Sequence, residues 1–167
     1  MSLTLLRHAP IPKAYHGKYN GHSDIPIDLT LFSPITLPQT YDLVYSSDLC
    51  RCTQSLEALG YSDFTTDKRL REVRFKEEFE GKTFEEIEKM ESYNPRFLES
   101  QTLWHNFVCD ETLEQFRGRI TSFLDDLPPK QNILICSHSG TIQEILSLLQ
   151  RVPERLGYLE YTIVTVK

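Results

Sequence analysis

The stretch Leu3-Thr4-Leu5-Leu6-Arg7-His8-Ala9-Pro10 joins a short apolar run to an arginine and a histidine. An apolar run of this length, bounded by a proline, is typical of a buried strand that ends in a turn. The Arg-His pair alone would also fit a basic turn on the surface. Whether the turn is functional therefore depends on what the other strand-like segments carry.

Two more strand-like segments end in polar groups that suit phosphate. Residues 42–46 are followed by Ser47-Asp48-Leu49-Cys50-Arg51, and residues 132–136 are followed by Ser137-His138-Ser139-Gly140. In an open α/β sheet, ligands bind in the crevice beyond the carboxyl ends of parallel strands. The sequence therefore predicts a parallel sheet with one polar rim. The side chains at that rim would be Arg7, His8, Arg51 and His138.

The chain has 167 residues, of which 40% are apolar and 25% are charged. This size and composition are typical of a soluble domain with a core of its own. The longest apolar runs fall far short of the roughly 20 residues that a membrane helix needs, and no charged-then-apolar signal region is present. We therefore expect one cytoplasmic domain that has no membrane partner.

Charge and cysteines restrict the partners further. The net charge of −6 argues against broad nucleic-acid binding, which depends on many cations that neutralise phosphates. A local pocket around two arginines suits a small anionic substrate better than a polyanion. The four cysteines, Cys50, Cys52, Cys109 and Cys136, follow no zinc-site spacing and are expected to be reduced packing thiols. No metal or cofactor is predicted.

Capping signals and apolar spacing predict the remaining elements. Helices are expected over residues 50–59, from the N-cap Thr83 to about residue 90, from the N-cap Asp110 through residues 113–127, and over residues 141–150. A final strand over residues 158–166 would lie on an edge of the sheet. Residues 11–26 are expected to form an ordered loop over the strand ends, where loops commonly hold substrate.

Residues 67–81 are rich in charge and begin an excursion away from the sheet. Asn94-Pro95 is expected to break the helix that Thr83 starts. Residues 93–107 then predict a loop-like region rich in aromatic side chains, namely Tyr93, Phe97, Trp104 and Phe107. These rings can form a satellite core beneath a lid, or they can stack directly on a substrate.

The residue types at the predicted rim suit phosphoryl transfer. A phosphomonoester needs cations that hold its oxygens, and arginine does this best because its planar fork donates in pairs. Arg7 and Arg51 are the candidates. A neutral imidazole can attack phosphorus through one nitrogen while the other donates to a carbonyl, and His8 at a strand end suits that role.

The remaining candidate residues are expected to contact a bound phosphate or the leaving group. His138 and Ser139 precede a helix, whose N-terminus favours an anion, and both are assigned to the phosphate pocket. The leaving oxygen also needs a proton from a carboxyl group. Glu72 is the choice for this acid, with Glu77, Glu78 and Glu80 as alternatives. The histidines 16, 22 and 105 are expected to be ordinary loop histidines.

These residues resemble the motifs of the histidine phosphatase superfamily, which has the phosphoglycerate-mutase-like fold. The segments that carry the resemblance are Leu6-Arg7-His8-Ala9, residues 19–26, residues 45–53, Leu70-Arg71-Glu72 and Ser137-His138-Ser139-Gly140. The resemblance implies an α/β fold: a three-layer sandwich with a mostly parallel central sheet, helices on both faces and a small helical lid insertion over residues 73–109. It also implies a phosphohistidine at His8, a pocket from Arg7, Arg51 and His138, and Glu72 as proton donor, without a metal.

The sequence departs from the family pattern at several positions. Ala9 replaces the signature glycine, and Ile11 and Ala14 stand where a hydroxyl residue and an asparagine are common. A missing donor would then come from Tyr19 or Asn20 in the substrate-side loop, to which Gly21 also belongs. Lys76 replaces a glycine in a segment that is one residue longer than usual.

The sequence therefore predicts a metal-independent phosphomonoesterase that acts on a small phosphorylated metabolite. The pattern looks most similar to α-ribazole phosphatases of cobalamin synthesis, which makes α-ribazole 5′-phosphate the best candidate substrate. A protein phosphohistidine phosphatase and a catalytically silent phosphate-binding regulatory module are the alternatives.

Overall fold

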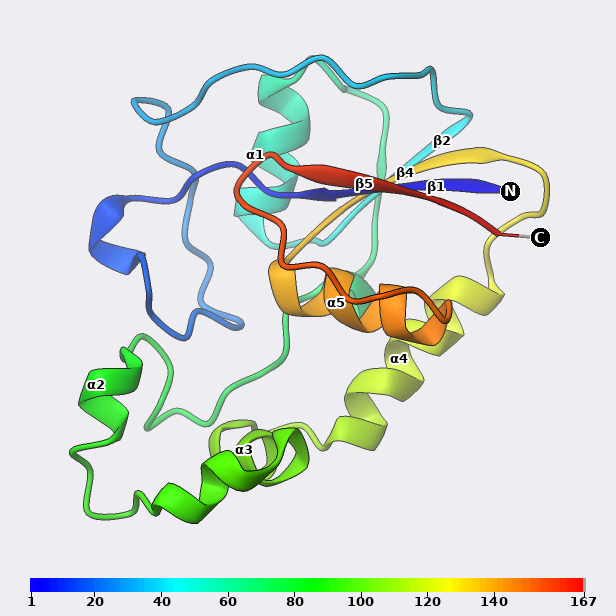
Figure 1. Ribbon diagram of the computed structural model, residues 1–167. Coiled ribbons are helices and arrows are strands. Elements are labelled where there is room, and N and C mark those ends of the chain that lie inside the picture. Colours follow the sequence, from blue (N-terminus) through cyan, green and yellow to red (C-terminus); the bar gives the residue numbers. More distant parts are fainter. Residues whose placement is uncertain (167) are drawn as a thin grey trace.

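The computed structural model describes residues 1–166. Within these residues, five strands form one sheet in the order β3-β2-β4-β1-β5 (Figure 1). The strands are β1 (Ser2–Arg7), β2 (Leu43–Ser46), β3 (Thr65–Thr66), β4 (Asn132–Ser137) and β5 (Tyr161–Thr165). The first four are parallel where they pair, and β5 is an antiparallel edge strand. The predicted edge strand is thus confirmed, although it begins at Tyr161 rather than residue 158.

Helices cover both faces of the sheet, which confirms the predicted α/β fold (Figure 1). Alternate residues of β1 point to opposite faces, as the period of a strand requires. Leu3 and Leu5 pack in the core that includes α4 (Leu113–Asp125) and α5 (Ser139–Leu148), whereas Leu6 packs in the core that includes α1 (Cys50–Ala58). A strand that is apolar on both sides can lie only between two layers.

The ends of three helices show how well capping was predicted. Leu59 follows the last residue of α1, and Gly60 takes a positive φ of 88°, a conformation that ends helices. The N-cap of α4 is Thr112, not the expected Asp110, because Thr112 forms a reciprocal capping box with Gln115. Asp110 instead pairs with Arg74 at 2.9 Å. Helix α5 begins at Ser139, two residues earlier than expected, and ends at Leu148.

Residues 73–109 form the excursion, with α2 (Phe84–Ile87), the 3-10 helix η3 (Pro95–Glu99) and α3 (Gln101–Val108). Thr83 caps α2 in a capping box as predicted, but the helix stops at Ile87 instead of residue 90. The loop predicted over residues 93–107 is wrong, because most of it is helical. The side chain of Asn94 caps η3 and that of Ser100 caps α3, so proline at the first position of η3 starts a helix rather than preventing one.

The aromatic side chains of this excursion pack around a small buried cluster. Its buried members are Phe79, Ile87, Val108 and Cys109. Trp104 and Phe107 pack against them, and Phe97 stacks on Phe107 with ring centroids 4.2 Å apart. Two short 3-10 helices complete the fold. Helix η1 (Lys13–Tyr15) lies in the first loop, residues 11–26, which contains the substrate-side positions 19–21, and η2 (Lys68–Leu70) precedes Glu72. No helix among residues 1–166 has the length and apolar character needed to cross a membrane.

Candidate active site

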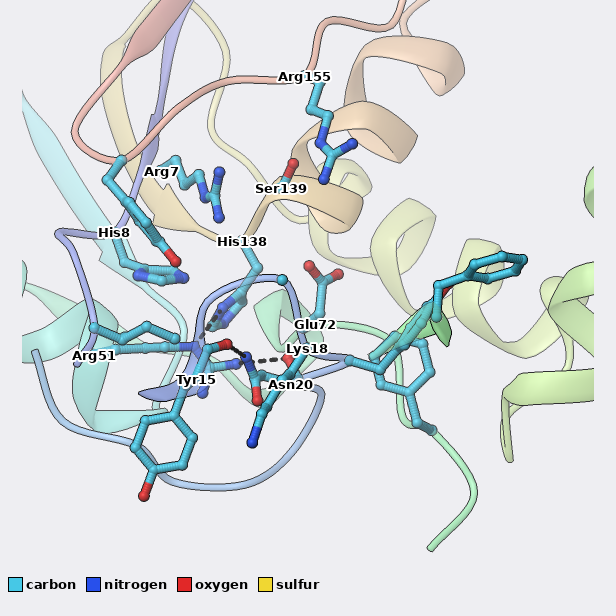
Figure 2. Close-up of a pocket in the computed structure, with 16 residues that line it drawn as sticks. Arg7, His8, Tyr15, Lys18, Asn20, Arg51, Glu72, His138, Ser139 and Arg155 are labelled. Atoms are coloured by element: carbon cyan, nitrogen blue, oxygen red, sulfur yellow. Dashed lines mark hydrogen bonds between the residues drawn. The ribbon is translucent and has the colours of Figure 1, made fainter. Parts of the chain in front are cut away.

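A cavity of about 390 Å³ opens beyond the carboxyl ends of β1 and β4. Figure 2 shows that side chains from both of these strand ends point toward the cavity. Side chains from α1 and from the first loop also line it. The structure brings together all six residues that the sequence assigned to catalysis and phosphate binding. They are Arg7, His8, Arg51, Glu72, His138 and Ser139.

His8 is buried and neutral at the wall of this cavity. Its Nδ1 donates to the carbonyl oxygen of Ala9 at 2.8 Å, so Nε2 carries the lone pair. Burial, and then the positive charge of Arg51, hold the pKa of His8 well below its usual value in spite of that hydrogen bond. An imidazole in this state can act as a nucleophile through Nε2 at neutral pH.

Arg7 presents one edge of its guanidinium group without a partner. Its Nη1 donates to the carbonyl oxygen of Leu156 at 2.7 Å, and its Cζ lies 4.2 Å from the centroid of the Tyr158 ring. Its Nε is buried and has no hydrogen-bond partner in residues 1–166. A buried donor without a partner is costly unless a ligand completes it. The edge that carries Nε therefore suits an oxyanion.

Arg51 is only 1% exposed, and it makes bonds that sequence reasoning missed. Its Nη1 donates to the carbonyl oxygen of Ser23 and its Nη2 to that of Gly21, both at 2.8 Å. Its Nε donates to Nδ1 of His138 at 3.1 Å. Arg51 thus adds positive charge to the cavity while it holds the first loop and the second histidine in place. These partners lie far apart in the chain, and no local pattern announces them.

His138 lines the cavity, but both of its ring nitrogens have partners within the described chain. Because Nδ1 accepts from Arg51, Nε2 carries the proton and donates to Oγ of Ser47 at 2.9 Å. Burial, and then the charge of Arg51, place the pKa of His138 well below its usual value. The ring is therefore a neutral, fixed part of the wall in this arrangement.

Glu72 is the glutamate that the structure places in the cavity, at the start of α5. Its carboxyl oxygens accept from the backbone N–H of Gly140 at 2.9 Å and from that of Thr141 at 3.0 Å. A Cβ at position 140 would lie 2.6 Å from Oε1 of Glu72, so only glycine permits this approach. Among the alternatives, Glu77 and Glu78 line a separate hollow. Glu80 accepts from the backbone N–H groups of Gly21 and Ser23.

The substrate-side loop is only partly at the cavity. Tyr19 and Asn20 line it, whereas Gly21 does not. Gly21 lies against the excursion, where a Cβ would come within 2.5 Å of the carbonyl oxygen of Val73. Its carbonyl holds Arg51, so its contribution to the site is indirect.

The departures from the family pattern have simple structural accounts. Ala9 is buried without a positive φ, so this position does not need glycine. Its N–H donates to Oγ of Ser55 on α1 at 2.7 Å. Ile11 supplies an apolar part of the cavity wall, and Ala14 lies in η1 away from it.

The other histidines contact backbone carbonyl groups and do not line the cavity. The Nε2 atoms of His16, His22 and His105 each lie within hydrogen-bond distance of a backbone carbonyl oxygen, those of Ile11, Glu72 and Glu111 respectively. Among residues 1–166, no group of three or more His, Cys, Asp and Glu side chains is placed to hold a metal ion.

Sequence reasoning missed several residues of the cavity wall. They are Tyr15, Gly17, Lys18, Phe75, Phe84, Arg155 and Tyr158. Arg155 and Tyr158 come from the connection between α5 and β5. Tyr158 was expected to begin the last strand, and the sequence around Arg155 has no pattern that shows the direction of the connection. The signal for Phe75 and Phe84 was the aromatic content of the excursion, although the sequence did not show which rings face the cavity.

Residues 3–161 match the family model of the histidine phosphatase superfamily (branch 1), and the chain belongs to this family. One relative is Putative phosphoserine phosphatase 2 of Hydrogenobacter thermophilus, which is 34% identical over 88% of this chain and 77% of its own length. The family and this relative support phosphatase activity.

Solved structures share the fold. The α-ribazole phosphatase of Shigella flexneri superposes with a TM-score of 0.76 at 21% identity, covering 100% of this chain and 91% of its own. The phosphoglycerate mutase of Thermus thermophilus superposes with a TM-score of 0.74 at 23% identity, covering 98% of this chain and 92% of its own. At such identities the likeness concerns the fold alone.

Proposed function

We propose that this protein is a metal-independent phosphomonoesterase that hydrolyses a small phosphorylated metabolite through a phosphohistidine at His8. The observation that carries the proposal is the pairing of two unsatisfied groups in one cavity. Nε2 of His8 has a free lone pair, and the buried Nε of Arg7 has no partner in residues 1–166. A phosphoryl group completes both at once, because it offers an electrophilic phosphorus and acceptor oxygens.

In the first step, Nε2 of His8 attacks phosphorus and the N–P bond forms as the ester P–O bond breaks. Glu72, as the carboxylic acid, gives its proton to the leaving oxygen. In the second step, the Glu72 carboxylate takes a proton from water, which attacks phosphorus as the N–P bond breaks. Phosphate leaves, and neutral His8 and the acid form of Glu72 are restored. The position of Glu72 in the cavity supports this assignment over Glu77, Glu78 and Glu80.

The phosphate pocket in this proposal consists of Arg7, Arg51, His138 and Ser139. Arg7 supplies the free donor edge. Arg51 supplies positive charge, while its Nη1 and Nη2 donate to carbonyl oxygens of the first loop. His138 holds Nε of Arg51 in the free enzyme and reaches a phosphoryl oxygen only by giving up its bond to Ser47. Ser139, at the N-terminus of α5, adds the favourable end of the helix dipole.

Two substrates are the first to test. α-Ribazole 5′-phosphate is suggested by the sequence motifs, and it would link the protein to cobalamin synthesis; the α-ribazole phosphatase of Shigella flexneri shares the fold. L-Phosphoserine is suggested by the Hydrogenobacter thermophilus relative. Both are small phosphomonoesters.

We also propose that the chain forms one domain in which residues 73–109 act as a lid, and that it works in the cytoplasm. Phe75 and Phe84 of the excursion line the cavity, which supports the lid. The four cysteines are unpaired thiols, which fits a reducing compartment. The small substrate is the proposed partner, and nucleic acid and membrane are not.

The test is phosphate release from an aryl phosphate, α-ribazole 5′-phosphate and L-phosphoserine in the presence of EDTA. Turnover that survives chelation and is lost in His8→Gln supports the proposal. Binding of phosphate without release from any ester would favour a silent regulatory module. Release only from a phosphohistidine protein would favour the protein phosphohistidine phosphatase.

A further inference from the structure

One side of the cavity is an aromatic wall that the proposed mechanism does not use. It consists of Tyr19 from the first loop, Phe75 after Glu72, and Phe84 at the start of α2. All three side chains are half-buried, so part of each ring packs inside the protein and part faces the cavity. Full burial would have made them core residues, and the structure does not bury them fully.

The aromatic wall is held rigidly from behind. Tyr19 meets Phe75 edge-on with ring centroids 5.2 Å apart, and Phe84 lies 5.6 Å from Trp104. Trp104 belongs to the satellite cluster and does not line the cavity. The four aromatic side chains for which two roles were considered, Tyr93, Phe97, Trp104 and Phe107, therefore take the satellite-core role, and none of them lines the cavity. The cluster supports the wall, and the wall faces the cavity.

Backbone contacts fix the first loop against the excursion at the same place. The N–H of Tyr19 donates to the carbonyl oxygen of Lys82, and the N–H of Gly81 donates to that of Tyr19, both at 2.8 Å. A Cβ on Gly21 would come within 2.9 Å of the Phe75 ring, so glycine allows the loop to lie directly on that ring. A surface that is ordered before binding loses little entropy when a ligand packs on it.

Two cations also line the cavity, but neither is held in place. The side chains of Lys18 and Arg155 make no hydrogen bond or ion pair with the described part of the chain, and Arg155 is exposed. Their charge raises the positive potential that attracts a phosphate dianion. A built carboxylate site would instead have its cations fixed by neighbouring groups.

We infer that the aromatic wall is the leaving-group subsite, and that it favours phosphomonoesters whose alcohol part carries a planar aromatic or heteroaromatic ring. This inference rests on the proposed phosphomonoesterase activity. A substrate ring that packs on this wall is stabilised by stacking in addition to the apolar area that it buries. Among the two candidate substrates, α-ribazole 5′-phosphate has such a ring and L-phosphoserine does not.

The two alkyl esters in the test have alcohols of similar acidity, so that their leaving-group chemistry is matched. We would measure kcat/KM for 2-phenylethyl phosphate, n-butyl phosphate and L-phosphoserine in the wild type. The expected preference for the phenylethyl ester over the butyl ester is about 10-fold, which corresponds to about 1.4 kcal/mol. L-Phosphoserine is expected to be the poorest of the three.

Variants locate the preference in the wall. Phe75→Leu and Phe84→Leu are each expected to lower the ratio between the phenylethyl and butyl esters at least 3-fold. Phe97→Leu is the matched control, because Phe97 stacks on Phe107 of the excursion, pairs with no ring of the wall and does not line the cavity. This variant is expected to keep the wild-type ratio.

Three results would overturn the inference and leave the phosphomonoesterase standing. They are equal kcat/KM for the two alkyl esters in the wild type, a preference for L-phosphoserine, and a phenylethyl preference that survives both phenylalanine substitutions. The wild-type ratio needs no variant, so a variant that fails to fold does not remove the test. Absence of release from any ester would instead overturn the proposed function, and the inference with it.

Discussion

At the scale of single residues, the site depends on burial that sets protonation and on donors that are left free. His8 is neutral because it is buried beside Arg51, and its Nδ1–H is occupied by Ala9. The position of these groups at one rim followed from the strand-end pattern in the sequence. The partners of Arg51 and His138 could not be predicted, because they are set by residues 28 to 91 positions away in the chain.

Glu72→Gln tests the proposed acid. An amide can neither donate a proton to the leaving oxygen nor take one from water, so kcat for an alkyl phosphate is expected to fall about 100-fold or more. The measurement is steady-state phosphate release, with Glu77→Gln as the control because Glu77 lies at a separate hollow. Unchanged turnover in Glu72→Gln would move the role to another group.

The protonation of His8 makes a second prediction at this scale. An ordinary histidine would lose its lone pair as the pH falls through about 6.5. Because the pKa of His8 is lowered well below that value, kcat/KM is expected to persist below pH 6.5 and to fall only in more acidic solution. The profile has to be corrected for ionisation of the substrate phosphate, whose second pKa is about 6. An acid limb with its midpoint at or above 6.5 would contradict a neutral, buried nucleophile.

At the scale of elements, capping chemistry was predictable and competition between caps was not. Thr83 begins α2 as its capping box indicates. Asp110 and Thr112 could both have started α4, and the choice was made by Gln115 three residues after Thr112 and by the Arg74 partner of Asp110. The loop predicted over residues 93–107 is wrong because Pro95, which cannot continue one helix, begins the next.

Ser55 links two elements of the site and gives a prediction at this scale. Its Oγ accepts from the N–H of Ala9 after β1 and donates to the carbonyl oxygen of Arg51 within α1. Ser55→Ala leaves a buried N–H without a partner, which costs about 1–3 kcal/mol. Urea denaturation would measure the loss, and Ser62→Ala, at an exposed position, is the control. Equal stability of the two variants would contradict the proposed link between β1 and α1.

At the scale of the whole molecule, the parallel sheet with one polar rim was predictable, because the three strands that end in functional groups are largely apolar. The placement of the excursion was not, since its aromatic cluster depends on rings between Phe79 and Phe107 that follow no single period. The sequence therefore does not distinguish the rings of the aromatic wall from the cluster that supports them.

The two buried histidines also couple stability to pH. Both have folded-state pKa values below the unfolded value, so the unfolded chain binds more protons as the pH falls below about 6.5. The free energy of unfolding is therefore expected to fall with acidification, by up to about 1.4 kcal/mol per pH unit for each histidine. Urea denaturation at pH 7.5 and 5.5 would show this loss, and His8→Asn is expected to make it smaller. Stability that stays constant or rises toward pH 5.5 would contradict the burial of two neutral histidines.

The most direct test of the central proposal is to trap the covalent intermediate. The enzyme would be mixed with a phosphomonoester in EDTA, quenched in alkali within the first turnover, and mapped by mass spectrometry. The account predicts a phosphoryl group on His8 that is stable in base, labile in acid and absent from His8→Gln. Turnover without any protein-bound phosphoryl group, or with that group on another residue, would contradict it.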